Sequence, residues 1–305
     1  MIQAFGAYLL WAIFPLYFPL LEPAAPLEIL AHRFIWTFAL MAVVLLVTKK
    51  WRELRAASAR TWGITVAAAA FIAVNWGVYV FLVNTGRVAE AALGYFINPL
   101  VSVLLAVIFL KESLSRLQLA SIAVAFIAVI VLTIGVGYPP VWGLALAFSF
   151  GFYGLLKKQV SLSAGASLTA ESAVVMPVAI GYLVWLGNQG VGTFITEGTS
   201  HTLLLMSSGV ITAVPLLLFG IGAKKIPLAT IGLMQYLTPA VQMALAVFVF
   251  KEHLSTERWI GFIIIWIAVA IFMVDIVKRM RARRRTRRNA KRAVTTPEST
   301  VAPEH

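Results

Sequence analysis

Long runs of apolar residues, separated by short polar turns, dominate this chain of 305 residues. A helix that crosses a bilayer needs about 20 mostly apolar residues. Ten runs reach or approach that length, at 3–21, 27–47, 62–83, 88–110, 117–135, 141–157, 168–187, 202–222, 227–250 and 257–277. They occupy most of the chain and leave no room for a soluble catalytic domain. The pattern therefore predicts an all-α integral membrane protein with ten transmembrane helices.

The end of the fourth run is repeated near the end of the ninth. The stretch LAVIFLKESLS at 105–115 returns as LAVFVFKEHLS at 245–255, an offset of 140 residues. Extended to 89–129 against 229–269, the pairing gives 14 identities in 41 positions. Chance similarity of two apolar helices is the alternative. The matched proline, Lys-Glu and Leu-Ser, all aligned without a gap, argue against it.

The offset predicts two halves of opposite orientation. It spans five helices, an odd number, so one copy of the repeated turn faces the cytoplasm and its twin faces outside. We therefore expect two inverted five-helix repeats, residues 1–138 and 139–278. This is the architecture of many secondary transporters, in which the site between the halves opens to either side.

The positive residues lie mostly in alternate turns and set the orientation. On one face lie 21 of the 25 Lys and Arg residues: Lys49, Lys50, Arg52, Arg55, Arg60, Lys111, Arg116, Lys157, Lys158, Lys224, Lys225 and the ten between 278 and 292. The other face has three, Arg87, Lys251 and Arg258. Lys and Arg accumulate on the cytoplasmic side of membrane proteins, so both termini are expected in the cytoplasm.

Residues 279–305 are expected to form a disordered, basic, cytoplasmic tail. It contains the run RMRARRRTRRNAKRA, whose like charges repel one another. Beside a helix end, such a run binds anionic lipid headgroups or anchors the topology. The net charge of +13 is concentrated here and in short turns, so nucleic acid is not an expected partner.

Composition excludes several other classes. The chain is 61% hydrophobic and 12% charged, which fits lipid as its main solvent. It has no cysteine, its four histidines are scattered, and no phosphate-binding loop motif is present. We expect no metal, no cofactor and no ATP hydrolysis. The first run has no preceding Lys or Arg, so it is interpreted as a helix and not as a signal peptide.

Matched prolines indicate where a solute could bind. Pro99 and Pro239 lie in the middle of the fourth and ninth runs, and each removes a backbone hydrogen bond from its helix. Paired interruptions in the two halves of a transporter point to a midplane site. The polar residues beside them are Tyr95, Asn98, Gln235, Tyr236, Thr238 and Gln242. The alternative is a structural kink stabilised by neighbouring helices.

Four ionisable residues within the apolar runs are candidates for coupling or charge recognition: Glu28, His32, Arg33 and Glu171. A charge at the bilayer centre is costly, so each one needs a reason. Glu28 and His32 lie four apart on one helix face. A desolvated glutamate could serve a proton-coupled cycle. The alternative is that these groups reach the headgroups or pair with each other.

Aromatic residues with an amide form a second candidate group. Asn75, Trp76 and Tyr79 lie within one turn, while Trp11 and Tyr153 occupy roughly matching positions in the two repeats. An aromatic cavity with an amide suits amphipathic or aromatic solutes. Ordinary packing or an interfacial aromatic belt is the alternative. The pairs Lys111-Glu112 and Lys251-Glu252 are interpreted as turn anchors, with gating as the alternative.

Five stretches, in order along residues 1–277, resemble a known family: AHRFIW (31–36), NWGVYVFLVN (75–84), EAALGYFINPLV (90–101), ALAFSFGFYGLLKK (145–158) and QYLTPAVQMALAV (235–247). The chain resembles the EamA-type permeases of the drug/metabolite transporter superfamily, in particular the RarD branch. The resemblance implies ten helices in two five-helix repeats, a bacterial inner membrane and export of small metabolites or drugs. It settles neither the substrate nor the oligomeric state.

Three functions remain open at this point. The first is a secondary exporter of small solutes, with or without coupling to protons. The second is an uncoupled facilitator or scaffold. The third is a membrane-embedded lipid enzyme, for which Glu28 with His32 is the only candidate acid–base pair and no nucleophile accompanies it. The repeat and the paired prolines favour the first, and we do not expect an enzyme.

Overall fold

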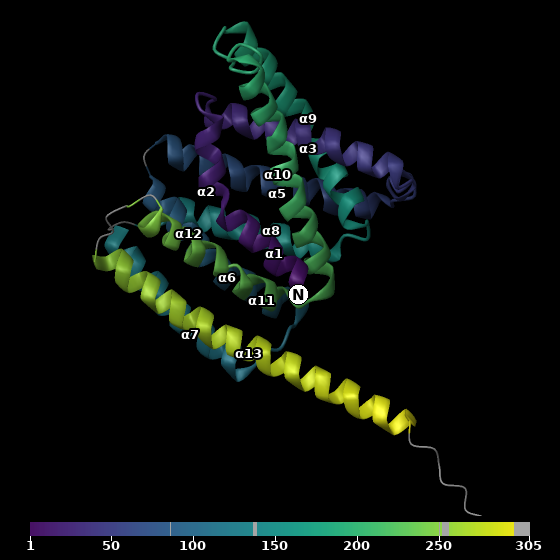
Figure 1. Cartoon of the computed structure of the whole chain (residues 1–305), viewed down its shortest axis with the longest axis vertical. Helices are drawn as coiled ribbons and strands as arrows, with labels where there is room; N and C mark the ends of the chain where they lie inside the picture. The colour runs from purple at the N-terminus through teal and green to yellow at the C-terminus, as the bar shows by residue number, and fades with distance from the viewer. Residues whose placement is uncertain (86, 137–138, 250, 252–255, 296–305) are drawn as a thin grey trace, which may run out of the picture.

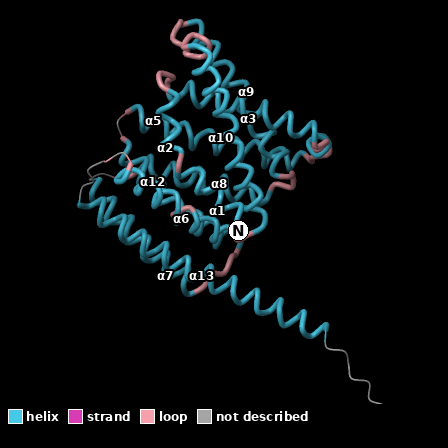
Figure 2. Tube along the Cα trace, in the orientation of Figure 1, coloured by secondary structure: helices cyan, strands magenta, loops and turns pink. Residues whose placement is uncertain are grey.

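The computed structural model describes residues 1–85, 87–136, 139–249, 251 and 256–295. In this part of the chain every regular element is a helix (Figures 1 and 2), which confirms the all-α class. The first half contains α1 (Ile2–Ala12), α2 (Phe14–Tyr17), the 3-10 helix η1 (Phe18–Leu21), α3 (Pro26–Val47), α4 (Trp51–Arg55), α5 (Ala59–Asn84), α6 (Val88–Leu110) and α7 (Arg116–Val136). The second half contains α8 (Val141–Gln159), α9 (Ala164–Asn188), α10 (Gly198–Lys225), α11 (Leu228–Met234), α12 (Leu237–Phe248) and α13 (Thr256–Thr295).

Eight segments of the described residues are long and apolar enough to cross a membrane. They are Ile2–Leu21, Pro26–Val47, Ala59–Leu82, Glu90–Leu110, Arg116–Ile134, Ala164–Asn188, Gly198–Lys225 and Trp259–Lys278. Eight of the ten predicted runs therefore meet this criterion. The two others, 141–157 and 227–250, differ from the prediction for separate reasons.

The run at 141–157 forms α8, whose apolar character is weaker. Glycines, a serine, a tyrosine and two terminal lysines interrupt its sequence. α8 packs against α5, α6 and α10, so much of its surface meets protein. The run at 227–250 forms two helices, because α11 ends at Met234 and α12 begins at Leu237. Neither piece alone reaches the length of a bilayer.

The basic tail differs from the expectation of disorder. α13 continues as one helix of 40 residues through Thr295. Ala, Arg and Lys are strong helix formers, and extending an existing helix avoids the cost of nucleation. Residues 296–305 lie outside the described part of the chain.

The helices form a bundle with a separate pair along one edge. α7 and α13 pack side by side there, as Figure 1 shows at the lower left. α3, α9 and α10 pack together on another side of the bundle. α6 lies between, in contact with α8 and α11, so helices from the two halves of the chain meet in the middle of the molecule.

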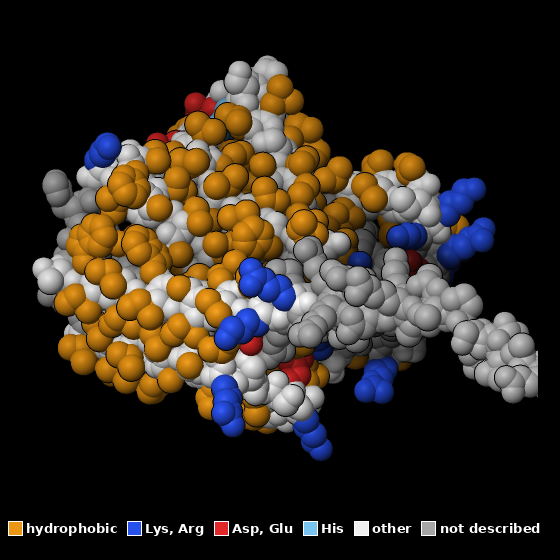
Figure 3. All heavy atoms as spheres, turned by 60° about the horizontal axis from the view of Figure 1, so that its bottom comes forward, with side chains coloured by type: hydrophobic (Ala, Val, Ile, Leu, Met, Phe, Trp, Pro, Cys, Tyr) orange, Lys and Arg blue, Asp and Glu red, His pale blue; other side chains and the backbone are white. Residues whose placement is uncertain are grey.

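The surface of the bundle is apolar over most of its area. Ile2, Val47, Ile134, Val178 and Phe248 each expose at least 70% of their surface. Figure 3 shows apolar side chains spread over one broad face, with most of the Lys and Arg side chains gathered toward its margin. Such a surface requires lipid in place of water, and the molecule is a multi-pass membrane protein.

One residue of the repeated turn has the same backbone conformation in both copies. Lys111 and Lys251 both lie in the left-handed region, with φ of 52° and 56°. Glu112 accepts hydrogen bonds from the backbone N–H groups of Leu228 (2.8 Å) and Ala229 (3.0 Å). It thereby satisfies donors that the first turn of α11 leaves unpaired. This confirms the anchor interpretation for Glu112, whereas Glu252 lies outside the described residues.

Candidate functional site

A cavity of about 700 Å³ lies between the two halves of the chain. α1, α3, α5 and α6 form one side of it. Phe150 of α8, Leu216 of α10 and the α11–α12 junction form the other. The exposed residues Glu22 and Pro26, at the turn between η1 and α3, also line it. The volume suits a drug-sized solute, and the lining is mostly aromatic and apolar.

The structure brings most of the sequence candidates together in this cavity. The sequence candidates that line it are Trp11, Arg33, Asn75, Trp76, Tyr79, Tyr95, Gln235, Thr238, Pro239 and Gln242. They come from segments far apart in the sequence and were selected for different reasons. Their convergence on one cavity makes it the candidate binding site.

Arg33 is the only cation among the described residues that line the cavity. Its Nε donates a hydrogen bond to Oγ1 of Thr212 at 2.9 Å. Its Cζ lies 4.1 Å from the ring centroid of Trp76 and 5.6 Å from that of Phe18. Cation–π contacts of this kind contribute about 0.5–2 kcal/mol each. The aromatic rings therefore hold the guanidinium in place without neutralising its charge.

The helix interruption predicted at Pro239 is present, but its twin at Pro99 is not. Pro99 lies inside the continuous helix α6, and α11 and α12 are separated at Gln235 and Tyr236. The carbonyl of Gln235, which a proline at 239 deprives of its usual donor, accepts a hydrogen bond from Thr238 N–H at 3.0 Å. One tight turn thus satisfies the backbone there.

Polar side chains near this junction connect α12 to α1. Oγ1 of Thr238 donates to the carbonyl of Tyr8 at 3.0 Å, and Nε2 of Gln242 donates to the carbonyl of Trp11 at 3.3 Å. Gln235 is buried, and its Oε1 has no hydrogen-bond partner in the described part of the chain. A buried acceptor without a donor is costly, so a donor that reached this atom would be stabilised.

Aromatic side chains pack against one another in part of the cavity wall and behind it. We call Tyr8, Trp11, Phe150, Tyr153 and Phe219 the aromatic floor. Phe150 lies 5.9 Å from Trp11 and 5.6 Å from Phe219 between ring centroids, and Tyr153 stacks on Phe219 at 5.9 Å. Tyr8, Trp11 and Phe150 face the cavity. Tyr153 is fully buried behind them.

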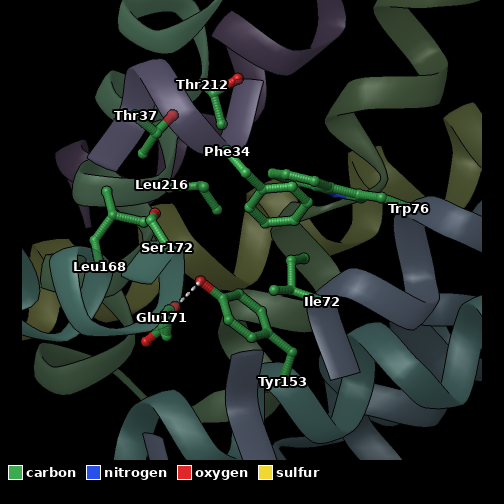
Figure 4. A pocket seen from close by; sticks show the side chains of 10 residues that line it. All are labelled: Phe34, Thr37, Ile72, Trp76, Tyr153, Leu168, Glu171, Ser172, Thr212 and Leu216. Carbon is green, nitrogen blue, oxygen red and sulfur yellow. Dashed lines mark hydrogen bonds between the residues drawn. The ribbon is translucent and has the colours of Figure 1, made fainter. Parts of the chain in front are cut away.

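A second, very small pocket of about 10 Å³ lies on the other side of Ile72, Trp76 and Leu216. These three residues line both spaces and separate them. Figure 4 shows the small pocket, with the hydroxyl of Tyr153 pointing toward the carboxylate of Glu171. That hydroxyl donates to Oε2 of Glu171 at 3.2 Å.

A buried ion pair lies next to this small pocket. Nζ of Lys157 is 2.6 Å from Oε1 of Glu171 and also donates to Oγ of Ser167 at 2.9 Å. Oγ of Ser167 donates in turn to Oε1 of Glu171 at 2.5 Å. Both charged side chains are almost fully buried. We call Lys157, Glu171, Ser167 and Tyr153 the inner cluster, which ties the end of α8 to the start of α9.

Sequence reasoning identified Glu171 and Tyr153 but missed the role of Lys157. In the sequence, Lys157 indicates only a positive charge on the cytoplasmic side. One signal was available, because Lys157 lies four residues after Tyr153 and so on the same face of α8. Its neighbour Lys158 points elsewhere and contacts the carbonyl of Ile226 (2.6 Å) and Oε1 of Glu112 (3.6 Å).

Glu28 and His32 lie away from the cavity lining. Oε1 of Glu28 accepts hydrogen bonds from the backbone N–H groups of Thr193 (2.7 Å) and Phe194 (3.2 Å). The ring of His32 lies 4.6 Å from that of Phe194. The two side chains therefore hold the segment between α9 and α10 against α3. Their observed contacts are with other parts of the protein.

Asn98, Pro99 and Tyr236 are buried beside the cavity but do not line it. In the part of the chain that the structure describes, neither amide atom of Asn98 has a hydrogen-bond partner, and the hydroxyl of Tyr236 also lacks one. These atoms lie inside the protein at the level where α6 meets α11. They remain candidates for contact with solute in another conformation.

Comparisons with known proteins agree with this architecture. The model of the EamA-like transporter family matches the chain twice, at residues 1–134 and 138–274. Protein RarD of Streptomyces exfoliatus is 44% identical over 306 residues, covering 100% of this chain and 96% of the relative. The transporter YojE of Bacillus subtilis is 44% identical over 283 residues, covering 90% and 94%. One solved crystal structure shares the fold with a TM-score of 0.67 at 18% identity, covering 90% of this chain and 96% of that chain.

These matches define a class and a branch within it. A fold of membrane-spanning helices around a central cavity, with a duplicated family match, is that of a transporter. The chain belongs to the EamA-like transporter family of the drug/metabolite transporter superfamily, within the RarD branch. Its relatives are described as transporters, which points away from an enzyme.

Proposed function

We propose that this protein is a secondary active transporter that exports small metabolites or drugs by alternating access between two inverted five-helix repeats. The single observation that carries the proposal is the cavity of about 700 Å³, which both halves of the chain line. A site between two similar halves opens to one side or the other when the halves rock against each other.

Ten transmembrane helices are part of this proposal. α8 supplies the sixth crossing, and α11 with α12 supplies a discontinuous ninth. Discontinuous helices at membrane depth occur where the irregular backbone is buried in protein or lines a cavity. Gln235 at the junction lines the cavity, in agreement with that rule.

The contacts between halves support an exchange of the two repeats. Matching helices by order pairs α1 with α8, α3 with α9, α5 with α10, α6 with α11–α12 and α7 with α13. The contact between α5 and α8 then corresponds to that between α10 and α1, and both are present. The contact between α5 and α9 corresponds to that between α10 and α3, and both are present as well.

The proposed conformation is open to the outside and closed to the cytoplasm. The positive-inside rule puts the turn at Glu22 outside and the end of α8 at Lys157 inside. The cavity reaches exposed residues at the outer turn. In this proposal, the aromatic floor and the inner cluster lie on the closed, cytoplasmic side. Opening inward requires that the tie between α8 and α9 at Lys157 and Glu171 be broken or moved.

Proton coupling at Glu171 is proposed as the driving force. Protonation of Glu171 removes the charge that holds Lys157, and the inner cluster then loses its strongest contact. Cytoplasmic termini, the bacterial inner membrane as location and anionic headgroups as partners of the basic segment after Lys278 belong to the same proposal.

The test is transport by the purified protein in liposomes. Labelled amino acids, nucleosides and chloramphenicol are screened with and without an imposed pH gradient, for wild type, Glu171→Gln and Asn98→Ala. Uphill accumulation that Glu171→Gln abolishes, with the variant still folded, supports a proton-coupled transporter. Movement only down the solute gradient, unaffected by pH and by Glu171→Gln, makes the protein a facilitator. Chemical conversion of lipid without solute movement overturns the transporter proposal.

A further inference from the structure

Arg33, which is half-buried in the cavity wall, has no carboxylate partner among the described residues, unlike the buried Lys157. Among the described residues, the ion pairs are Arg87 with Glu90, Lys157 with Glu171, and Lys158 with Glu112. None of them includes Arg33. The protein therefore neutralises Lys157 with its own glutamate and leaves the positive charge of Arg33 without a counter-ion in the cavity wall.

The carboxylates nearest in sequence are engaged elsewhere or exposed. Oε1 of Glu28 accepts two backbone N–H groups of the segment between α9 and α10. Glu22 lines the cavity but is exposed at its rim and makes no ion pair with Arg33. An unpaired charge in apolar surroundings is costly, and the cost falls when an anion enters.

The guanidinium of Arg33 is held in a defined orientation, with hydrogen-bond donors left over. Within the described residues its one hydrogen bond is from Nε to Oγ1 of Thr212, at 2.9 Å. The rings of Trp76, Phe18 and Phe14 surround its Cζ at 4.1, 5.6 and 5.9 Å from their centroids. A guanidinium has five N–H donors in a planar fork that matches a carboxylate. Its terminal nitrogens are therefore available for a bidentate contact.

The remaining cavity walls indicate the chemical character of the rest of the solute. Its walls are mainly aromatic and apolar, and one cation is present among the described lining residues. A single positive charge compensates a monoanion better than a phosphate dianion. Oε1 of Gln235 is buried, has no partner among the described residues, and would accept a hydrogen bond from a solute donor that reached it.

We propose that the solute is an organic monoanion, with a carboxylate held by Arg33 and an aromatic or apolar body packed against the cavity walls. This inference rests on the proposed transport function and names its substrate class. The shared chemistry could also come from a lipid phosphate, so the test must separate a free carboxylate from a headgroup.

Binding is tested with three probes that share one aromatic body and differ in charge. Radiolabelled indole-3-acetate is the anion, indole-3-acetamide the neutral analogue and tryptamine the cation. The full-length protein is placed in nanodiscs of phosphatidylcholine at neutral pH. The expected result is saturable binding of indole-3-acetate at least tenfold tighter than that of the amide, and no competition by tryptamine. Equal affinity for the acid and the amide overturns the proposal without any variant.

Variants of Arg33 then locate the charge. Arg33→Gln is expected to weaken the binding of indole-3-acetate at least tenfold, since a charged bidentate contact is lost. The affinity for the amide should stay within about twofold of the wild-type value. Arg33→Lys, which keeps a charge without the fork, should fall between. The matched control is Arg55→Gln, because Arg55 also stacks on a tryptophan, Trp51, at 4.5 Å but lies outside the cavity. Equal losses in the two glutamine variants overturn the assignment.

A competition experiment with lipid and a transport assay distinguish the remaining outcomes. If phosphatidylglycerol in the nanodiscs displaces indole-3-acetate, a lipid phosphate occupies Arg33 and the proposal of a free carboxylate fails. If the carboxylate binds at Arg33 but no solute is transported in liposomes, the proposed transport function is wrong and the binding site stands. If only neutral solutes are transported, at a rate that Arg33→Gln does not change, the carboxylate site is wrong and the transport function stands.

Discussion

Lys157 and Glu171 form an ion pair of 2.6 Å behind the aromatic floor of the cavity, and both side chains are almost completely buried. Two buried charges that lie within hydrogen-bonding distance compensate each other, but either one alone is strongly destabilising. The pair joins the end of α8 to the start of α9, at the end of the cavity that we propose to be closed. It is therefore suited to act as a latch between two conformations.

Glu171→Gln should open this latch. The substitution leaves Lys157 without a counter-charge, at a cost of about 3–5 kcal/mol for a buried pair that loses one partner. The chain has no cysteine, so one introduced residue reports accessibility. Ser172, which lines the small pocket, is replaced by cysteine and treated from the cytoplasmic side with a membrane-impermeant maleimide. We expect labelling at least tenfold faster with Glu171→Gln than without it.

The control for this experiment is Glu197→Gln, which removes an exposed carboxylate far along the chain from the inner cluster. It should leave the labelling rate at 172 unchanged. Equal rates with and without Glu171→Gln, in protein that remains folded by its tryptophan fluorescence, would show that the ion pair does not close the inner side.

The outer side of the cavity should already be open. Ala92 lines the cavity and is exposed, whereas Ala170 is 1% exposed. In intact cells, an impermeant maleimide added outside should label Ala92→Cys rapidly and Ala170→Cys at least tenfold more slowly. Preferential labelling of Ala92→Cys in inverted vesicles would instead place this opening in the cytoplasm and reverse the proposed orientation.

The residues of the cavity were largely predictable, because polar and aromatic side chains are rare in apolar helices. Asn75, Tyr79 and Gln242 stood out for that reason, and the structure places all three in the cavity lining. The left-handed backbone shared by Lys111 and Lys251 likewise agrees with the repeat found by sequence identity.

Contacts between distant helices were not predictable in the same way. The spacing puts Lys157 on the same face of α8 as Tyr153, but it does not identify Glu171 as the partner, because that residue lies on another helix. The positions of the Phe14 and Phe18 rings near Arg33 depend on how α2 and η1 are placed relative to α3. The matched prolines illustrate a further limit, since α6 continues through Pro99 while the chain breaks before Pro239.

Glu112→Ala should lower stability without changing the cavity. Its carboxylate accepts two N–H groups at the start of α11 and lies 3.6 Å from Lys158. Loss of a helix cap costs about 0.5–2 kcal/mol, which corresponds to a decrease in Tm of a few degrees. Thermal unfolding followed by tryptophan fluorescence measures this shift. Glu197→Ala is the control, because Glu197 precedes α10 without a side-chain cap bond, and its Tm should not change.

Pro239→Ala should impair transport more than it affects folding. The new N–H at position 239 can donate to the carbonyl of Gln235 and compete with the existing bond from Thr238 at 3.0 Å. The chain between α11 and α12 would then wind toward a continuous helix and move Gln235 relative to the cavity. Pro99→Ala is the matched control, because α6 is already continuous there. We expect at least a fivefold loss of transport rate for Pro239→Ala and a smaller loss for Pro99→Ala, at similar Tm. Equal losses for both would mean that the broken helix has no special part in transport.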